Sequence, residues 1–356
     1  MVDEDGKNLK IPKPISAGII LSYKCTNECR HCMYACSPKW RGDWMNLEDG
    51  RLILSRLADM LSGIYPEDTA GVSLNMGVHF TGGEPFLRFS LLLEMVRMAS
   101  RFGLPGLFVE TNSFWCTDDE RVERMLLQLK EAGLDGILIS ANPFVVEHIP
   151  FDRVERAIRL SRKVFGWRNV MIYHDLFYSQ LKALGIRGTI TFEEYLRRMA
   201  ERDPVSLHMG LGFPSLLPMG RAPYRLGHLY RRYPAERFFK ESCLEELTRN
   251  WHTHIDNYHN YITGYCAGIS LGDFMDDSLF EYGVDLEEHP IIGALTSKRG
   301  LEKLFKLGVE EFGYRELRDG YISKCHLCVD LRRHIALETD EFKELNPREF
   351  YRHLTG

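Results

Sequence analysis

The stretch that decides the fold is AGIILSYKCTNECRHC, residues 17–32, in which an apolar run is followed directly by three cysteines. The apolar run is typical of a buried strand. Cys25, Cys29 and Cys32 are separated by three residues and then by two. Three thiolates can hold three irons of a cubane [4Fe–4S] cluster and leave the fourth iron open to another ligand. The alternative is a zinc site completed by His31, although structural zinc prefers paired ligands across a longer loop.

A second motif, TGGEP, occupies residues 81–85 and ends the next predicted strand, GVHFT at 77–81. Its two glycines allow a ligand to approach the backbone closely, and its proline restrains Glu84 to an extended conformation. Exposed N–H groups and a fixed carboxylate suit a ligand with an amino group. Alone, the motif is equally compatible with a tight turn. Because it follows a strand that is preceded by three clustered cysteines, it indicates a binding site.

Hydrophobic periodicity predicts alternating strands and helices from residue 17 to about residue 212. The predicted strands are 17–22, 77–81, 107–112, 136–140, 169–174 and 206–212. The predicted helices are 47–64 (capped by Asn46), 90–102, 117–132, 151–165 and one that begins at a capping box of Thr191 and Glu194. Six strand–helix units in a row imply parallel strands with right-handed crossovers. We therefore expect an α/β protein with a partial (β/α)6 TIM-like barrel, and an eight-unit barrel is the alternative.

The pattern changes after residue 212, where four prolines and many arginines and tyrosines indicate a connector. Irregular spacing after Cys243, with a hairpin expected around Asp256 and Asn257, predicts a small α+β extension. The expected segments are a lead-in at 1–16, the barrel at 17–212, the connector at 213–242, the extension at 243–335 and a surface helix or tail at 336–356.

The composition argues against some classes of binding partner and cellular location. The net charge is −5, from 45 basic and 50 acidic residues, which argues against a protein held to nucleic acid by a general basic surface. No apolar run is long enough for a membrane span, and the charged start lacks the apolar core of a signal peptide. We expect a cytoplasmic protein without a membrane partner. Nine cysteines, an odd number, then favour metal ligands over disulfides.

Four further cysteines form a second set near the end of the chain. Cys325 and Cys328 belong to CHLC, Cys266 stands in GYCAGISLGD, and Cys243 precedes it by 23 positions. Four thiolates suffice to close an iron–sulfur cluster, but CxxC pairs also suit a zinc site with four cysteine ligands. On the cysteine chemistry alone, an iron–sulfur cluster and a zinc site fit these four residues equally well.

Taken together, CxxxCxxC after one strand and GGEP after the next resemble the radical S-adenosylmethionine (radical SAM) superfamily. In that family the three cysteines bind a [4Fe–4S] cluster, SAM chelates its open iron, and an electron cleaves SAM to methionine and a 5′-deoxyadenosyl radical that removes a hydrogen atom from a substrate. The resemblance implies Cys25, Cys29 and Cys32 as cluster ligands. The SAM-contacting residues that it implies are His31 near adenine, Thr81, Gly82, Gly83, Glu84 and Pro85 near the amino group, and Thr111, Asn112 and Ser140 at strand ends. Ser113 stands where the family has a glycine.

PMGRA at 218–222, the hairpin and the late CxxC are similar to radical SAM enzymes with a SPASM or shortened twitch extension. Such extensions hold auxiliary [4Fe–4S] clusters, and four cysteines fit one cluster, with Cys243, Cys266, Cys325 and Cys328 as its ligands. Enzymes of this type frequently modify ribosomally made peptides, so a peptide is the first expected substrate. Because only about 16 residues precede the first strand, a small molecule or cofactor-pathway intermediate is the alternative. A low-potential donor such as flavodoxin or ferredoxin would supply the electron.

Two cysteines lie outside both sets. Cys36 and Cys116 are candidates for donating a hydrogen atom to a substrate radical, as in radical SAM epimerases, or they are buried core residues. His252, His254 and His259 lie near Cys266 and could suggest a metal site, but their spacing favours surface or hydrogen-bonding residues. The non-enzyme alternatives are an iron–sulfur electron carrier and a zinc-stabilised binding protein.

Overall fold

The structure is a computed structural model that describes residues 2–3, 5–66, 71–212 and 215–355. The chain divides into two compact units. The sheet unit consists of Ile15–Cys29 and Ser37–Leu217. The second unit consists of Met1–Pro14, Arg30–Cys36 and Pro218–Gly356. The boundary after Leu217 falls within the predicted connector, and most of that connector belongs to the second unit.

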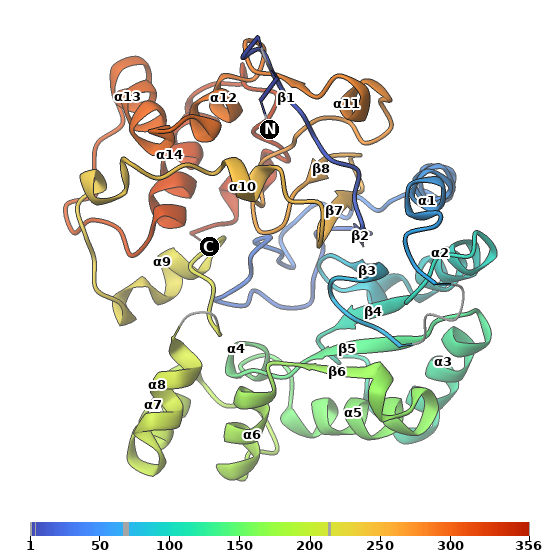
Figure 1. The fold of residues 1–356 in the computed structure, drawn as a ribbon. Coiled ribbons are helices and arrows are strands. Elements are labelled where there is room, and N and C mark those ends of the chain that lie inside the picture. The colour runs from blue at the N-terminus through green and yellow to red at the C-terminus, as the bar shows by residue number, and fades with distance from the viewer. Residues whose placement is uncertain (1, 4, 67–70, 213–214, 356) are drawn as a thin grey trace. The chain divides into compact units, whose positions relative to one another are not determined.

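A parallel sheet forms the centre of the sheet unit, with the strand order β6-β5-β4-β3-β2 (Figure 1). Its strands are β2 (Ser16–Ile20), β3 (Gly77–Thr81), β4 (Phe108–Thr111), β5 (Gly136–Ser140) and β6 (Val170–Tyr173). Each strand lies where the periodicity predicts one, and β3 and β5 match the predicted bounds. The order follows the chain strand by strand, so strands that are consecutive in the sequence are neighbours in the sheet. The mixed α/β class with a mostly parallel sheet is confirmed.

Helices connect these strands and begin at polar caps. Asn46 accepts a hydrogen bond from Asp49 N at the start of α1 (Leu47–Leu61), as predicted. Thr191 caps α7 (Phe192–Arg202) through Glu194 N, whereas the Glu194 carboxylate pairs with Arg197. The other helices of the unit are η1 (Pro85–Arg88), α2 (Phe89–Arg101), α3 (Asp119–Glu131), α4 (Pro143–Val146), α5 (Phe151–Phe165), η2 (Trp167–Asn169), α6 (Asp175–Ala183) and α8 (Pro204–Leu211).

The predicted sixth strand at 206–212 is wrong, because this segment belongs to helix α8. Pro204 occupies its first turn, and the Asp203 side chain accepts a hydrogen bond from Ser206 N. A cap followed by proline is a strong helix start, and the short apolar run behind it does not distinguish strand from helix. Within the described ranges, the sheet unit therefore has five parallel strands rather than six.

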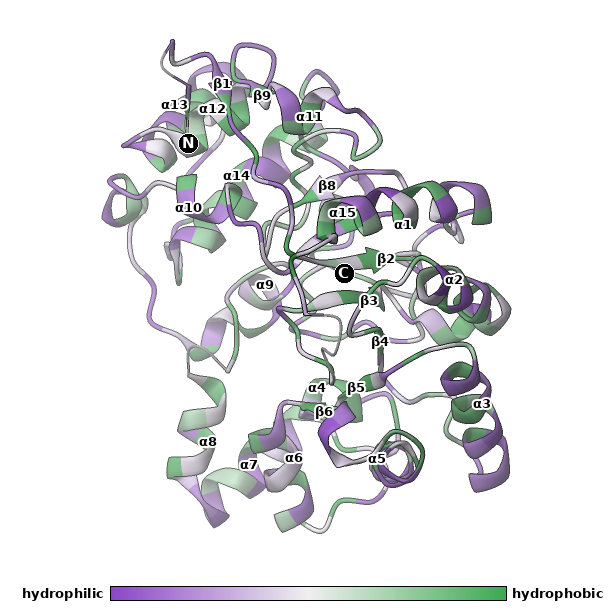
Figure 2. Cartoon of the chain, turned by 45° about the vertical axis from the view of Figure 1, so that its right-hand side comes forward, coloured by the Kyte–Doolittle hydropathy of each residue, from purple (hydrophilic) through white to green (hydrophobic). Residues whose placement is uncertain are grey.

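The two faces of this sheet differ in polarity. Val78, Phe80 and Val109 are fully buried and alternate with His79, Thr81 and Glu110 along β3 and β4. Side chains of a strand alternate between faces, so one face is apolar and the other carries polar groups. In Figure 2, β2 and β3 carry green, whereas α3 and α5 carry purple bands, so these strands are more apolar than these helices.

Short elements build the second unit. The hairpin of β7 (Thr253–Asp256) and β8 (Tyr261–Ile262) is antiparallel, and Asp256 Oδ1 accepts hydrogen bonds from Tyr258 N and Asn260 N in the turn, which confirms the predicted hairpin. The other strands are β1 (Asn8–Leu9) and β9 (Val284–Asp285), which pair with each other. The helices are α9 (Ala222–Leu226), η3 (Gly227–Leu229), η4 (Ala235–Phe238), α10 (Leu244–Leu247), α11 (Ser278–Glu281), α12 (Pro290–Thr296), α13 (Gly300–Phe312), α14 (Lys324–Glu338) and α15 (Glu349–Arg352).

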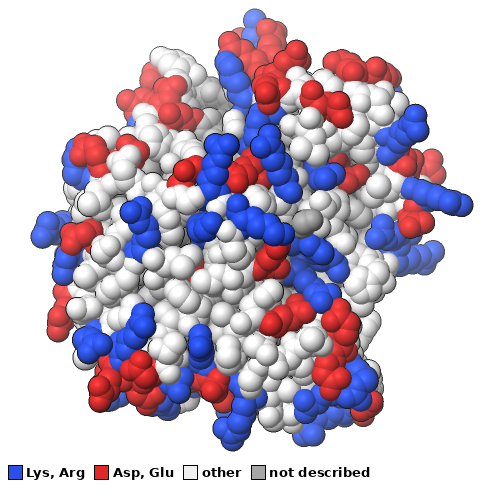
Figure 3. All heavy atoms as spheres, turned by 180° about the vertical axis from the view of Figure 1, so that it is seen from behind, with Lys and Arg blue, Asp and Glu red and all other residues white. Residues whose placement is uncertain are grey.

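Charged side chains of both signs are interspersed on the face drawn in Figure 3, in keeping with the small net charge. No helix in the described part of the chain is long and apolar enough to cross a membrane.

Candidate functional site

In the sheet unit, the TGGEP turn packs directly against the backbone that leads into the first cysteine. Gly83 N donates to Ser22 O at 2.7 Å, and Glu84 N donates to Lys24 O at 3.1 Å. A Cβ on Gly83 would lie 2.0 Å from Lys24 O, so only glycine fits this approach. The two motifs that the sequence analysis singled out are therefore in contact, and Cys25 is fixed beside the turn.

The Glu84 carboxylate is buried and holds the end of β4. It accepts hydrogen bonds from Thr111 Oγ1 at 2.9 Å, Asn112 N at 2.8 Å and Phe86 N at 3.2 Å. Burial raises the pKa of Glu84 to about 7, against these three hydrogen bonds, which favour the charged form. Through these contacts, Glu84 positions Thr111 and Asn112.

Asn112 connects the end of β4 to the cysteine loop. Its Nδ2 donates to Thr26 Oγ1 at 2.9 Å and approaches Cys25 Sγ at 3.7 Å, and Asn27 N lies 3.4 Å from the same sulfur. The next residue, Ser113, has a φ of +69°, the left-handed conformation that glycine adopts most easily. The loop thus has a glycine-like backbone although the glycine of the family pattern is absent.

Cys32 lies in the 30–36 loop of the second unit. Cys36 N donates to Cys32 Sγ at 3.3 Å, and hydrogen bonding from Cys36 together with the charge of Arg221 lowers the pKa of Cys32 to about 6. Arg221 is buried, and its Nη2 donates to Ala35 O at 2.7 Å and to Cys36 O at 3.1 Å. Cys32 is therefore a thiolate near neutral pH, the form that binds metal.

The remaining predicted residues of these loops occupy different environments. Cys36 is buried and contacts the Cys32 sulfur through its backbone. Cys116 is fully buried, and burial together with the charge of Glu84 raises the pKa of Cys116, so its thiol stays protonated. Cys29 and His31 are half-buried, Ser140 ends β5 half-buried, and Pro85 begins η1. No described contact assigns either Cys36 or Cys116 to a substrate.

The four C-terminal cysteines come together within the second unit. Cys243 precedes α10, Cys266 follows β8, and Cys325 and Cys328 are three residues apart on the first turns of α14, so they share one helix face. Burial and the mutual repulsion of the sulfurs raise the pKa of Cys266 and of Cys325 to about 12, and that of Cys243 further. All four sulfurs are therefore close enough to influence one another.

Their spacing bears on which metal they suit. Among the described residues, no three of these sulfurs lie within 4.8 Å of one another. Tetrahedral zinc, with Zn–S bonds of about 2.3 Å, brings its sulfurs to about 3.8 Å from one another. A cubane cluster binds each thiolate to a separate iron and holds the sulfurs farther apart. The described sulfurs are therefore not at the spacing of a bound zinc ion, and four convergent thiols are enough to hold a cubane cluster.

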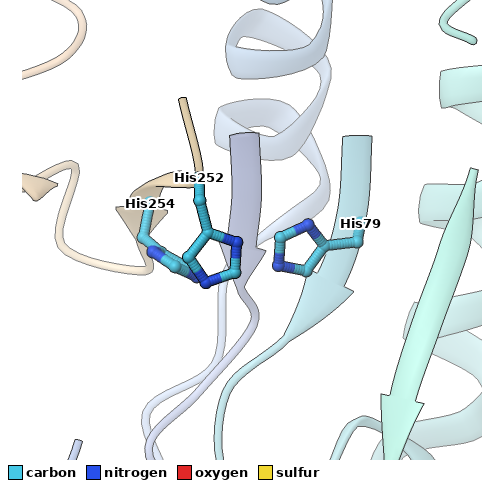
Figure 4. Close-up of side chains that lie close together, drawn as sticks. All are labelled: His79, His252 and His254. Carbon is cyan, nitrogen blue, oxygen red and sulfur yellow. The ribbon is translucent and has the colours of Figure 1, made fainter. Parts of the chain in front are cut away.

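The polar face of the sheet carries groups that the sequence analysis missed. Thr81 Oγ1 donates to Glu110 Oε2 at 2.6 Å, and His79 Nε2 lies 3.6 Å from Glu110 Oε1. His79 (Figure 4) stacks on Phe108 with ring centroids 4.7 Å apart. Burial raises the pKa of Glu110 to about 7, although 28% of its side chain is exposed. The available signal was the alternation of apolar and polar residues in VHFT, which puts His79 and Thr81 on one face, whereas FVET does not alternate and gave no such signal for Glu110.

Two histidines of the second unit are buried rather than at the surface. His252 and His254 (Figure 4) have ring centroids 4.9 Å apart, and His254 Nδ1 lies 2.8 Å from Tyr34 OH. The surface alternative is wrong, and the hydrogen-bonding alternative is confirmed for His254. His252 lies just before β7 and has a φ of +53°. The sequence pattern did not predict this left-handed conformation.

No protein-family model matches the chain, and no curated protein matches its sequence. Among solved structures, the chain is similar to BtrN in complex with AdoMet and 2-DOIA, with 11% identity, a TM-score of 0.40 and coverage of 82% of this chain and 91% of that chain. It is also similar to native anSMEcpe with bound AdoMet, with 12% identity, a TM-score of 0.43 and coverage of 91% and 99%. A structure of anSMEcpe with AdoMet and Kp18Cys peptide gives 12% identity, a TM-score of 0.41 and coverage of 91% and 96%.

Proposed function

We propose that the chain is a radical SAM enzyme that begins its reaction by removing a hydrogen atom from a substrate C–H bond. Cys25, Cys29 and Cys32 would hold a [4Fe–4S] cluster, which when bound supplies the electron that cleaves SAM. The observation that carries this proposal is the packing of Gly83 against Lys24 O, because it puts the TGGEP backbone beside the first cysteine.

The surrounding contacts support separate roles for the neighbouring residues. Glu84 fixes the end of β4 through Thr111 and Asn112, and Asn112 contacts the Cys25 sulfur. We assign these three residues to positioning. The lowered pKa of Cys32 supports its role as a ligand, because a thiolate binds iron without first losing a proton. His31 and Ser140 would contact the adenosine part of SAM, as the family resemblance implies.

The C-terminal cysteines would hold an auxiliary [4Fe–4S] cluster. Their convergence in the second unit, with no three of the described sulfurs within 4.8 Å of one another, supports a cubane over zinc. Such a cluster could accept an electron from a product radical or bind substrate. A low-potential donor such as flavodoxin or ferredoxin would reduce the enzyme. A cytoplasmic location stays a prediction from the polar start of the sequence and from the lack of a long apolar run.

Peptide modification is the substrate class that we propose, on the resemblance of the C-terminal segment to peptide-modifying enzymes, and a small molecule is the alternative. The polar face formed by His79, Thr81 and Glu110 supports a substrate with polar groups, because these residues offer donors and an acceptor on one face of the sheet. A short peptide encoded beside the gene, where one exists, should change in mass when it is incubated in D2O with enzyme, SAM and reductant, either by net loss of hydrogen or by incorporation of deuterium. An unchanged peptide mass would favour the small-molecule alternative.

The test of the proposed reaction is 5′-deoxyadenosine formation. Anaerobically reconstituted protein, with dithionite and SAM, should form 5′-deoxyadenosine and methionine in equal amounts. A Cys25/Cys29/Cys32→Ala variant should form neither, whereas a Cys325/Cys328→Ala variant that retains iron at the first site should still cleave SAM. No 5′-deoxyadenosine from iron-loaded protein would contradict the proposal.

A further inference from the structure

One buried arginine stands beside the C-terminal cysteines. Arg332 lies on α14, one helical turn after Cys328, and is 4% exposed. Its Nε donates to Cys328 Sγ at 3.4 Å. Hydrogen bonds to the sulfur ligands of a cluster are among the features that set its reduction potential.

The same guanidinium reaches the loop that carries Cys266. Arg332 Nη1 donates to Ala267 O at 3.1 Å and to Tyr351 OH at 2.8 Å, and Tyr351 OH in turn donates to Gly268 O. Arg332 therefore connects helix α14 to the Cys266 loop and fixes the orientation in which it meets the Cys328 sulfur.

The charge of Arg332 has no carboxylate partner in the described part of the chain. Its hydrogen-bond acceptors are a sulfur, a backbone carbonyl and a tyrosine hydroxyl. Lys324, at the other side of the cysteine set, differs, because its Nζ lies 2.6 Å from Glu246 Oε1. A buried cation without a counter-charge costs several kcal/mol, so Arg332 needs anionic neighbours. The sulfurs of Cys328 and Cys266 lie near this guanidinium, and they would supply the negative charge when they bind iron.

We propose that Arg332 is a positioning residue that raises the reduction potential of a cluster held by the four C-terminal cysteines. This inference rests on the proposed auxiliary cluster. Reduction takes one electron from an external donor, makes and breaks no bond, and adds one negative charge to an already anionic site. The fixed positive charge and the N–H donated to Cys328 stabilise that added charge, so Arg332 makes the cluster easier to reduce.

The experiment is a redox titration in the Cys25/Cys29/Cys32→Ala background, so that only the second site contributes. Iron content is measured first, and the reduced cluster is then followed by electron paramagnetic resonance against mediators of known potential. The variants are Arg332→Gln and Arg332→Lys, and the matched control is Arg333→Gln, which removes the neighbouring arginine of the same helix, whose Nη2 contacts Thr355 Oγ1.

We expect Arg332→Gln to lower the ratio of reduced to oxidised cluster about tenfold at a fixed ambient potential, equal to about 59 mV for one electron. Arg332→Lys should give a smaller shift because the charge is kept, and Arg333→Gln should shift the ratio less than about twofold, because its side chain makes no described contact with a cysteine sulfur. If Arg332→Gln does not bind iron, the result for Arg332→Lys tests the proposal. The proposal requires Arg332→Lys to lower the ratio of reduced to oxidised cluster as well.

Three results would overturn the inference. An unchanged potential in Arg332→Gln and Arg332→Lys with full iron content would show that Arg332 does not set the potential. Equal shifts in Arg332→Gln and Arg333→Gln would indicate a general charge effect instead. A background variant without any iron would overturn the proposed auxiliary cluster itself, and the inference with it.

Discussion

Cys25 lies in the sheet unit beside closely packed backbone, whereas Cys243, Cys266 and Cys328 come from separate elements of the second unit, where a buried arginine contacts the Cys328 sulfur. In the first region, Gly83 lies so close to Lys24 O that a methyl group has no room. In the second region, a guanidinium donates to a sulfur and to a neighbouring loop. A site built from adjacent residues can thus be held by close packing, while a site built from distant residues needs side chains that bridge them.

The largest expected effect comes from filling the space at Gly83. In Gly83→Ala, the Cβ would meet Lys24 O at 2.0 Å and Lys24 C at 2.3 Å, so the turn and the cysteine loop must separate. We expect 5′-deoxyadenosine formation to fall by about 100-fold, because a displacement of about 1 Å near reacting groups costs that much. The iron of the second site should be unaffected. The matched control is Gly188→Ala, where nothing lies within 4 Å of the new Cβ. Equal activities of the two variants would mean that close packing does not hold the first site.

A smaller effect is expected when the Glu84 carboxylate is removed. Glu84→Ala leaves Thr111 Oγ1, Asn112 N and Phe86 N without their acceptor in a buried place. Each unpaired buried donor costs about 1–3 kcal/mol, so we expect a loss of about 3 kcal/mol or more in the free energy of unfolding. Thermal unfolding measures it, with the exposed Glu120→Ala as control. Similar midpoints for the two variants would contradict the positioning role.

The pH dependence of stability follows from Glu110. Its pKa is about 7 in the folded protein and 4.5 in the unfolded chain, so between these values the folded state binds more protons than the unfolded state. The contribution of this group to stability should therefore be complete below pH 4.5 and should be lost as the pH rises towards 7. Glu110→Gln should reduce the fall of the thermal midpoint between about pH 5 and about pH 7.

The pKa of Glu84 is also raised, and His79 faces Glu110. Glu110→Gln should therefore reduce the fall of the thermal midpoint with pH and not abolish it. The control is Glu131→Gln, because Glu131 is exposed. The thermal midpoint of this variant should depend on pH as it does in the wild type. A Glu110→Gln profile parallel to that of the wild type would show that Glu110 titrates normally.

The smallest expected effect is a gain in stability at Ser113. This residue has a φ of +69°, and its hydroxyl is buried without a hydrogen-bond partner among the described residues. Ser113→Gly should stabilise the fold by about 1 kcal/mol, because it removes left-handed strain that outweighs the added flexibility of the unfolded chain. Ser113→Ala, which removes only the hydroxyl, should gain less. A lower thermal midpoint for Ser113→Gly would show that the hydroxyl makes a stabilising contact.

Much of the sheet unit could be predicted from local patterns. β3 and β5 have the predicted bounds, and Asn46 caps α1 as expected, because alternation and capping are properties of neighbouring residues. The segment at 206–212 was misassigned because a short apolar run suits both strand and helix, and the Asp203 cap decided the outcome. The cysteines of both sets were recognisable from their spacing.

The residues that tune these sites could not be predicted in the same way. Arg332 becomes notable only when the fold brings it to Cys328 and Ala267, and Glu110 only when β3 puts Thr81 and His79 beside it. In a linear sequence, each is one of many charged residues. Long-range contacts, which local periodicity does not encode, give them their roles.

The central claim is that the chain holds two iron–sulfur sites, and iron and sulfide content tests it most directly. After anaerobic reconstitution, we expect about eight irons and eight sulfides per chain in the wild type, and about four of each in both the Cys25/Cys29/Cys32→Ala and the Cys243/Cys266/Cys325/Cys328→Ala variants. About four irons in the wild type, lost entirely in the first variant, would contradict the second cluster. Zinc without iron in all three proteins would contradict the account as a whole.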